Sequence, residues 1–122
     1  MADPWTRMVR SLMEPTAQTY QPAFWQPPTD IYRTASGWLV KFDLAGVRPE
    51  DIELEVSGCY LTVRGIRRDW AIEEAAHSYS MEISYNRFQR SIQLPCELEH
   101  ARVAWEYRDG MLLVRLTMER EP

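Results

Sequence analysis

The sequence predicts an all-β fold: an immunoglobulin-like β-sandwich preceded by a short N-terminal arm that combines a helix with a proline-rich stretch. After residue 29, apolar and polar residues alternate with a period of two along several short segments, as in strands that bury one face. Turn-forming residues separate these segments roughly every 8–12 residues, which is typical of a sandwich. A chain of 122 residues has room for one such domain.

The first 28 residues differ in composition from the rest of the chain. They hold five of the eight prolines and no glycine. Asp3 is suited to cap a helix, Pro4 to occupy its first turn, and Pro15 ends the run. A helix of about ten residues is marginal alone, so its apolar stripe needs a partner. The stripe consists of Trp5, Met8, Val9, Leu12 and Met13, which recur at helical spacing.

An extended arm, broken by prolines, follows this helix over residues 16–28. It carries Tyr20, Phe24 and Trp25, which we expect to be exposed or docked on another surface. Prolines keep such a segment from forming a regular element. We therefore divide the chain into an arm (1–28), a domain (29–118) and a very short tail (119–122).

The alternation sets the strands of the domain. The segment 52–56 is the clearest case, because its apolar residues alternate with Glu53 and Glu55 to give one apolar and one acidic face. A loop or single helical turn over 47–51 precedes it. In chain order, we expect about eight strands, at 30–34, 38–44, 52–56, 60–64, 78–84, 88–94, 104–108 and 111–118.

The last two strands form the most informative segment, a predicted β-hairpin over 104–116. Trp105 and Tyr107 alternate with their neighbours as in a half-buried strand. Asp109 and Gly110 form a tight-turn dipeptide, because glycine accepts the positive φ that such a turn requires.

Composition excludes several classes of partner. The net charge of −4 argues against nucleic acid. No stretch approaches the roughly 20 apolar residues of a membrane span, and none near the start is suited to a secretory signal. Cys59 and Cys96 match no metal-ligand spacing and indicate small apolar side chains in a reduced protein. We therefore expect a cytoplasmic protein.

The sequence supports no catalytic site, metal site or cofactor. His77 and His100 are distant in sequence from both cysteines, and the five glycines do not form a phosphate-binding loop. The basic cluster Arg64, Arg67 and Arg68 lies in an acidic chain, so we expect it to pair with acidic neighbours rather than with phosphates.

Five sequence blocks, in the same order and at compatible spacing, resemble the α-crystallin domain of the small heat shock proteins, in particular its bacterial members. The resemblance covers about residues 29–118. Ala45 replaces the proline of the family's D-L-P-G-V turn, and Asn86 replaces its usual glycine with a residue that tolerates the left-handed conformation. The blocks are D-L-A-G-V (43–47), P-E-D-I (49–52), L-T-V-R-G (61–65), M-E-I-S-Y-N-R-F (81–88), and the pair F-x-R-x-x-x-L-P (88–95) with A-x-x-x-x-D-G-x-L (104–112).

The resemblance implies a homodimer formed by strand exchange, with larger homo-oligomers also open. In bacterial and plant relatives, a strand in the long middle loop pairs with the partner's second strand. Here the donor is 78–84, carried on the connection 67–77, and the acceptor is 30–34. An alternating strand on a long arm is an unpaired edge, which favours such pairing. The implied interface residues are Ile31, Tyr79, Met81, Ile83 and Arg90, the last of which we expect to pair with a carboxylate.

The family's usual C-terminal motif, Ile-x-Ile or Ile-x-Val, does not occur after residue 118. In relatives this motif docks in a groove between the fourth and eighth strands of a neighbouring dimer. We therefore expect the corresponding groove to stand open or to accept another segment, such as 17–25, and higher assembly to rest on the N-terminal arm. The groove is lined by Ile52, Leu54, Val56, Val103, Trp105 and Tyr107.

The resemblance implies an ATP-independent holdase that binds non-native client proteins and performs no enzymatic chemistry. The apolar stripe of the arm could instead be a subunit contact at rest that dissociation exposes. The alternatives are a co-chaperone of the CS-domain type, without holdase activity, and a small enzyme or ligand-binding sandwich. The candidate client-binding residues are Trp5, Met8, Val9, Leu12, Met13, Tyr20, Phe24 and Trp25.

Overall fold

The computed structural model describes residues 24–69 and 76–119. The predicted N-terminal helix lies outside these residues, as does most of the arm that follows it. Six of the candidate client-binding residues therefore have no described position: Trp5, Met8, Val9, Leu12, Met13 and Tyr20.

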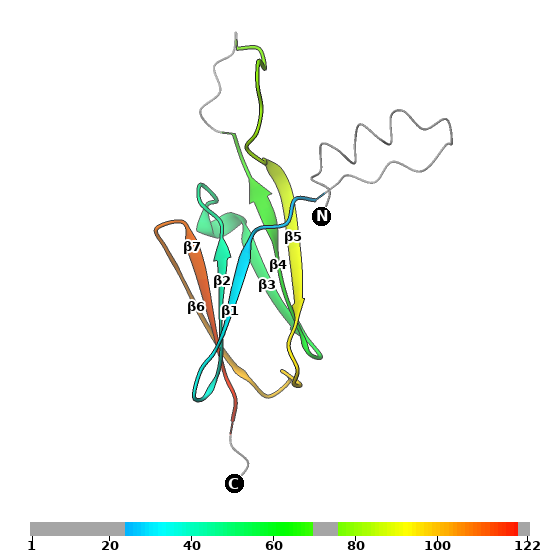
Figure 1. Ribbon diagram of the computed structural model, residues 1–122, viewed down its shortest axis with the longest axis vertical. Coiled ribbons are helices and arrows are strands. Elements are labelled where there is room, and N and C mark those ends of the chain that lie inside the picture. Colours follow the sequence, from blue (N-terminus) through cyan, green and yellow to red (C-terminus); the bar gives the residue numbers. More distant parts are fainter. Residues whose placement is uncertain (1–23, 70–75, 120–122) are drawn as a thin grey trace, which may run out of the picture.

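The described residues form a β-sandwich of two antiparallel sheets, which confirms the predicted fold class (Figure 1). A short 3-10 helix lies where a loop or helical turn was expected. The elements are β1 (Thr29–Arg33), β2 (Gly37–Asp43), η1 (Pro49–Asp51), β3 (Ile52–Ser57), β4 (Tyr60–Arg67), β5 (Asn86–Gln93), β6 (Arg102–Arg108) and β7 (Met111–Thr117).

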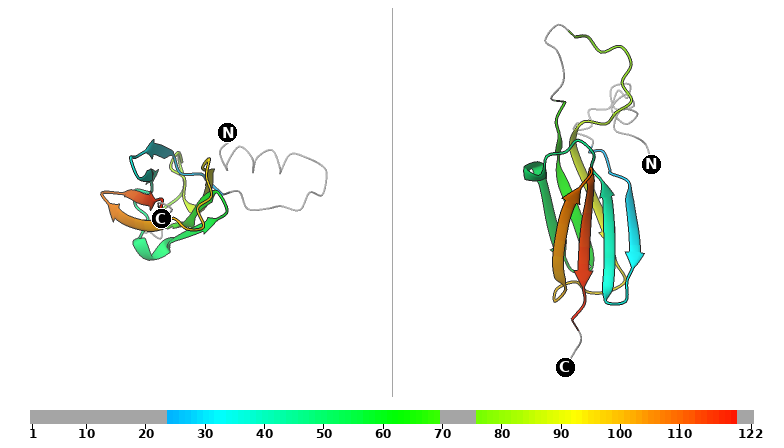
Figure 2. Two further views of the ribbon diagram at one scale, coloured as in Figure 1. Left: turned by 90° about the horizontal axis from the view of Figure 1, so that it is seen from below. Right: turned by 90° about the vertical axis from the view of Figure 1, so that its left-hand side faces the viewer.

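The order of strands decides which edges lie together. One sheet has the order β1-β2-β7-β6 and the other β3-β4-β5. Trp25, just before β1, pairs with Phe88 of β5. The β1 and β5 edges therefore lie on one side of the sandwich and the β3 and β6 edges on the other (Figure 2).

The core is formed by the inner faces of the two sheets. Val40 and Phe42 of β2 oppose Val114 and Leu112 of β7, and all four are fully buried. Trp25 is also part of the core. Among the described residues, none of the buried side chains is polar or charged, so apolar packing holds the sheets together.

The predicted turns have the expected backbone geometry. Asn86 has a φ of 70°, which confirms that it takes the left-handed place of a glycine. In the β6–β7 turn, Asp109 and Gly110 have φ values of 52° and 80°. A Cβ at Gly110 would lie 2.9 Å from the Cα atom of Ala45, so close packing as well as φ requires glycine here.

The strand predicted over 78–84 is wrong for the single chain. No β-strand is assigned to residues 76–85, the described part of this connection. A strand needs a neighbour that accepts and donates its backbone hydrogen bonds, and the neighbour expected here belongs to a second copy. β4 also extends three residues beyond its predicted end, because Arg67 still pairs with Asn86.

Candidate functional site

The predicted groove residues lie on the two edge strands β3 and β6, on one side of the sandwich. Ile52, Leu54 and Val56 are half-buried and pack against the core from β3. On β6, Val103 and Trp105 lie opposite Leu116 and Val114, which places both on the inner face at the sheet edge. We call the six groove residues the β3–β6 edge surface.

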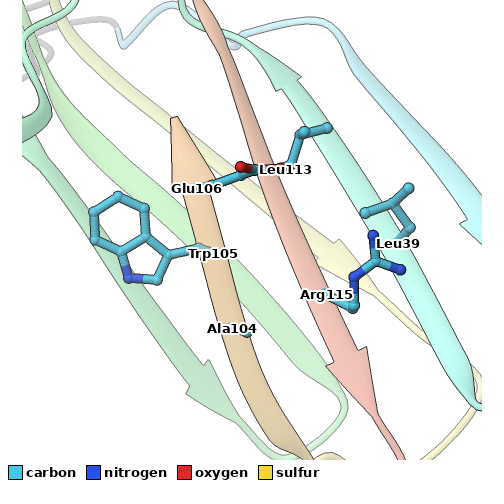
Figure 3. Close-up of a pocket in the computed structure, with 6 residues that line it drawn as sticks. All are labelled: Leu39, Ala104, Trp105, Glu106, Leu113 and Arg115. Atoms are coloured by element: carbon cyan, nitrogen blue, oxygen red, sulfur yellow. The ribbon is translucent and has the colours of Figure 1, made fainter. Parts of the chain in front are cut away.

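Trp105 is the most exposed member of this surface. Its side chain is 53% exposed, compared with 40% for Val103. In Figure 3 its indole projects away from the side chains of Leu113 and Arg115. A large aromatic side chain that is half in water on an inner face is suited to contact another chain.

Tyr107, in contrast, is tied to its own domain. Its hydroxyl donates a hydrogen bond to the backbone oxygen of Leu44, at 2.7 Å. Burial raises the pKa of this phenol above its usual value. Tyr107 therefore closes the end of the β3–β6 edge surface and does not offer its hydroxyl to a ligand.

A small pocket adjoins Trp105 on the other face of the same sheet (Figure 3). Its volume of about 160 Å³ is below the roughly 300–1,000 Å³ of sites that hold drug-sized ligands. This size does not favour a small-molecule site. It is lined by Leu39, Ala104, Trp105, Glu106, Leu113 and Arg115.

Four of the five residues predicted to form the dimer interface lie in two separate exposed regions. Tyr79 is fully exposed, and Met81 and Ile83 are 62% and 63% exposed. They lie in the segment that extends beyond the ends of β4 and β5 (Figure 1). Ile31 is 44% exposed on β1, an edge strand among the described elements. In the single chain, the apolar side chains of both regions are exposed to water.

The residues just before β1, 24–28, form a segment that we call the strap. The Trp25 N–H donates to the Arg87 oxygen (3.2 Å), and the Gln89 N–H donates to the Trp25 oxygen (3.1 Å). The Trp25 ring packs against Phe88 with centroids 5.2 Å apart. Two backbone bonds, a hydrogen bond from the Trp25 indole N–H to the Asn86 oxygen (3.2 Å) and this aromatic contact fasten the strap to the edge of β5.

Of the two positions expected for Trp25, exposed or docked, the structure shows the docked one. Trp25 is only 5% exposed, so it is not available to a client while the strap is docked. Phe24 remains 40% exposed and stays a candidate. Because the core includes Trp25, packing of the domain starts before the predicted boundary at residue 29.

Arg90 lies against the strap. It is half-buried on β5, and its Nη1 lies 3.5 Å from the backbone oxygen of Pro27. Arg90 is in none of the ion pairs formed between described residues. Its predicted pairing with a carboxylate therefore stays a prediction about a second copy.

Two members of the basic cluster pair with acidic neighbours, as predicted. Arg64 lies 2.9 Å from a carboxylate oxygen of Glu55, and Arg68 lies 3.1 Å from one of Asp51. The hydrogen bond from Arg68 lowers the pKa of Asp51. Arg67 differs: its guanidinium contacts backbone oxygens and aromatic rings.

Sequence reasoning missed the role of Arg67 and the surface on which Trp25 docks. Both depend on contacts between residues more than 40 positions apart. The only signal was the position of Trp25 beside two prolines, which indicated an extended segment but not the surface that holds it.

Among residues 24–69 and 76–119, no group of three or more histidine, cysteine or acidic side chains is placed to hold a metal ion. Within the same residues, the structure contains no helix with the length and apolar character needed to cross a membrane.

Comparison with known proteins gives a consistent result. The family model described as "Hsp20/alpha crystallin family" matches residues 30–122. The Small heat shock protein C2 of Rickettsia felis is 27% identical over 95 residues, covering 78% of this chain and 62% of that protein. The 18 kDa heat shock protein of Streptomyces albus G is 31% identical over 118 residues, covering 93% of this chain and 80% of that protein.

Solved structures show the same similarity. The hspA protein of Xanthomonas axonopodis superposes with a TM-score of 0.65 and 28% identity, over 78% of this chain and 95% of that one. The chain spans 58 to 62% of the length of the first curated relatives that it matches.

Proposed function

The chain belongs to the Hsp20/alpha crystallin family, and we propose that it acts as an ATP-independent holdase that binds unfolding proteins before they aggregate. Membership rests on a match over residues 30–122, most of the chain. The family consists of small heat shock chaperones, and no enzymatic reaction is proposed. We place this activity in the cytoplasm, as expected from the sequence.

The observation that carries the proposal is the exposure of apolar side chains at sheet edges. Trp105 and Val103 lie on the inner face of β6 and yet remain 53% and 40% exposed. Beside them, three half-buried apolar residues of β3 continue the surface. Such an edge offers an unfolding chain both apolar contact and unpaired backbone groups.

The arm is the second proposed client surface. Phe24 is 40% exposed, directly before the docked Trp25. The apolar stripe of residues 5–13 precedes it in sequence and is rich in methionine, a flexible side chain suited to varied partners. We propose that the arm and the β3–β6 edge surface bind clients together.

We further propose that the chain forms a homodimer by strand exchange. The segment 78–84 presents Tyr79, Met81 and Ile83 to water, and β1 has a free edge in the described structure. Pairing the segment of one copy with β1 of another would supply the backbone partners that both places need.

The test of the holdase proposal is light scattering by a heat-labile client at elevated temperature, without ATP and with increasing amounts of this protein. We expect scattering to fall at near-stoichiometric ratios. An inert protein of similar size serves as the control. Undiminished scattering at excess would contradict the proposal and favour a co-chaperone of the CS-domain type.

A further inference from the structure

Arg67, the last residue of β4, contacts three segments that are distant in sequence. Its Nε donates to the backbone oxygen of Ser84 at 2.8 Å, and Nη2 donates to the same oxygen. Its Nη1 donates to the backbone oxygen of Ala45 at 3.1 Å. Its guanidinium carbon lies 4.2 Å from the centre of the Trp25 ring. One side chain therefore joins the strap, the β2–β3 loop and the end of the connection before β5.

A second aromatic ring belongs to the same cluster. The guanidinium carbon of Arg67 lies 5.6 Å from the centre of the Tyr85 ring, within the range of a cation–π contact. Tyr85 and Ser84 are both half-buried, whereas residues 76–83 are exposed. The exposed segment 76–83 thus ends where Arg67 begins to hold the chain.

Arg67 differs from Arg64 and Arg68 in the groups that contact its guanidinium. Among the described residues, no carboxylate oxygen lies within 4.0 Å of its guanidinium, although its neighbours Arg64 and Arg68 each have one. Its partners among the described residues are carbonyl oxygens and aromatic faces. All of these partners meet on one rigid, planar group.

We propose that Arg67 couples the docking of the strap to the placement of Ser84 and Tyr85, so that release of Trp25 frees the segment that carries Tyr79, Met81 and Ile83. Loss of the Trp25 ring would open one face of the guanidinium to water. The Nε and Nη2 atoms of Arg67 would then no longer be held toward the Ser84 oxygen. The coupling is a property of the chain itself and does not depend on holdase activity.

Coupling through Arg67 would also involve the arm. Residues 24–28 connect the apolar N-terminal residues to the sandwich, and the segment 78–84 is the proposed dimer strand. Coupling through Arg67 would let an event at the arm, such as client capture, change the freedom of the dimer strand. Such a link requires one element with two states, and an event at each site must shift the balance between them. We assign this role to the Arg67 cluster, whose docked state is the one described here.

The test measures initial rates of chymotrypsin cleavage in the full chain, with each cut identified by mass spectrometry. Cleavage after Tyr85 reports local opening at the cluster, and cleavage after the fully buried Phe42 reports global unfolding. We expect Trp25→Leu to raise the Tyr85 rate about tenfold while the Phe42 rate changes less than about twofold.

A double-mutant cycle then isolates the coupling. We expect Arg67→Ala to raise the Tyr85 rate by itself, and Trp25→Leu to add less than about twofold in that background. If the increase in the Tyr85 rate in the double variant equalled the product of the two single increases, the two residues would act independently and the proposal would be overturned. An unchanged ratio of the Tyr85 rate to the Phe42 rate in Trp25→Leu would also overturn it.

Two controls keep the result specific. Val114→Ala removes buried atoms from β7, away from the cluster, and should raise the rate after Phe42 while leaving the rate after Tyr85, which reports local opening, nearly unchanged. Arg33→Ala removes a different arginine–tryptophan contact, with Trp38, and should leave the Tyr85 rate unchanged. If Arg33→Ala raised it as much as Arg67→Ala does, the coupling would not belong to Arg67.

If Trp25→Leu fails to fold, the effect of an Arg67 substitution on the strap tests the coupling instead. Arg67→Lys keeps the positive charge but lacks the planar fork. We expect it to raise cleavage after Phe24, in the strap, about tenfold over the Phe42 rate. Unchanged cleavage after Phe24 would show that Arg67 does not hold the strap, and would overturn the proposal.

Discussion

At the scale of single residues, hydrogen bonds from side chains to distant backbone oxygens connect parts of the sandwich that the sheets do not join. Tyr107 of β6 donates to Leu44 and Arg90 of β5 to Pro27, each across 63 positions of sequence. Such a bond contributes about 0.5–1.5 kcal/mol net, yet it fixes where a loop or strap lies. Substitutions at these residues therefore test both stability and placement.

Tyr107→Phe removes one of these bonds and leaves the ring in place. We expect the free energy of unfolding to fall by about 1 kcal/mol at neutral pH, measured by denaturant titration. Tyr60→Phe, at an exposed tyrosine of β4, is the control and should change it little. A loss no greater than that of the control would show that the Leu44 oxygen finds another donor.

The stability difference between the wild type and Tyr107→Phe should depend on pH. Because burial raises the pKa of Tyr107 in the folded state, its stabilising effect is complete below the unfolded pKa of about 10 and is lost as pH rises through the folded pKa. The advantage of the wild type over Tyr107→Phe should therefore shrink above about pH 10. Melting temperatures of both proteins between pH 7 and about pH 11 would check this. A constant difference would contradict it.

Arg90→Ala distinguishes two roles of this arginine. If Arg90 only donates to the Pro27 oxygen, the free energy of unfolding should fall by about 0.5–1.5 kcal/mol. If it also pairs with a buried carboxylate of a second copy, as we predict, the fall should reach about 2–5 kcal/mol. Thermal unfolding at several protein concentrations measures the difference, with Arg87→Ala, at an exposed position of the same strand, as the control. If Arg90→Ala melted like the wild type, both roles would be refuted.

At the scale of elements, the segment 78–84 has the pattern of a strand but no partner within its own chain. Met81→Asp places a charge among the side chains expected to face the partner, because Tyr79, Met81 and Ile83 alternate onto one face. We expect the dissociation constant of the dimer to rise at least about tenfold, measured by sedimentation or light scattering after size separation.

Ser80→Asp is the matched control, since it adds the same charge one residue away, on the opposite face of the expected strand. It should leave the dimer largely intact. Equal effects of the two substitutions would mean that the segment does not pair as a strand. A dimer that survives Met81→Asp would place the interface elsewhere.

The limits of prediction from sequence are clearest at this scale. Among the described strands, β3 and β6 alternate most clearly with a period of two, and β1 was found despite its mostly exposed residues, within one residue at each end. The segment 78–84 alternates equally well, but a strand also needs a partner, and periodicity carries no information about partners. The surface on which Trp25 docks, the edge of β5, was missed for the same reason, because the contact joins residues 63 positions apart.

The candidate site follows the same rule. Placement of Ile52, Leu54 and Val56 beside the β6 residues could be expected from the resemblance, because alternation fixes the face and the fold fixes the neighbouring edge. The exposure of each side chain could not, since it depends on packing between the sheets. Trp105 and Tyr107 both lie on the inner face of β6, yet one is exposed and the other is tied to Leu44.

At the scale of the whole molecule, the strap decides where the arm can be cut without damage to the sandwich. Trp25 and Pro27 are buried in the domain, so removal of residues 1–28 would take away part of the core. Removal of residues 1–23 leaves the strap and its hydrogen bonds to β5 in place. Only the shorter deletion separates the contribution of the arm from the stability of the fold.

We expect the chain lacking residues 1–23 to retain the dimer but to lose larger assemblies, because the apolar stripe that we propose as an assembly contact is absent. Light scattering after size separation measures the assembly, and the melting temperature shows that the sandwich is intact. In the aggregation assay, the shortened chain should need several times more protein for equal protection, with the β3–β6 edge surface as its remaining client site. Unchanged assembly size would show that the arm does not build oligomers, and unchanged protection would assign client capture to the sandwich alone.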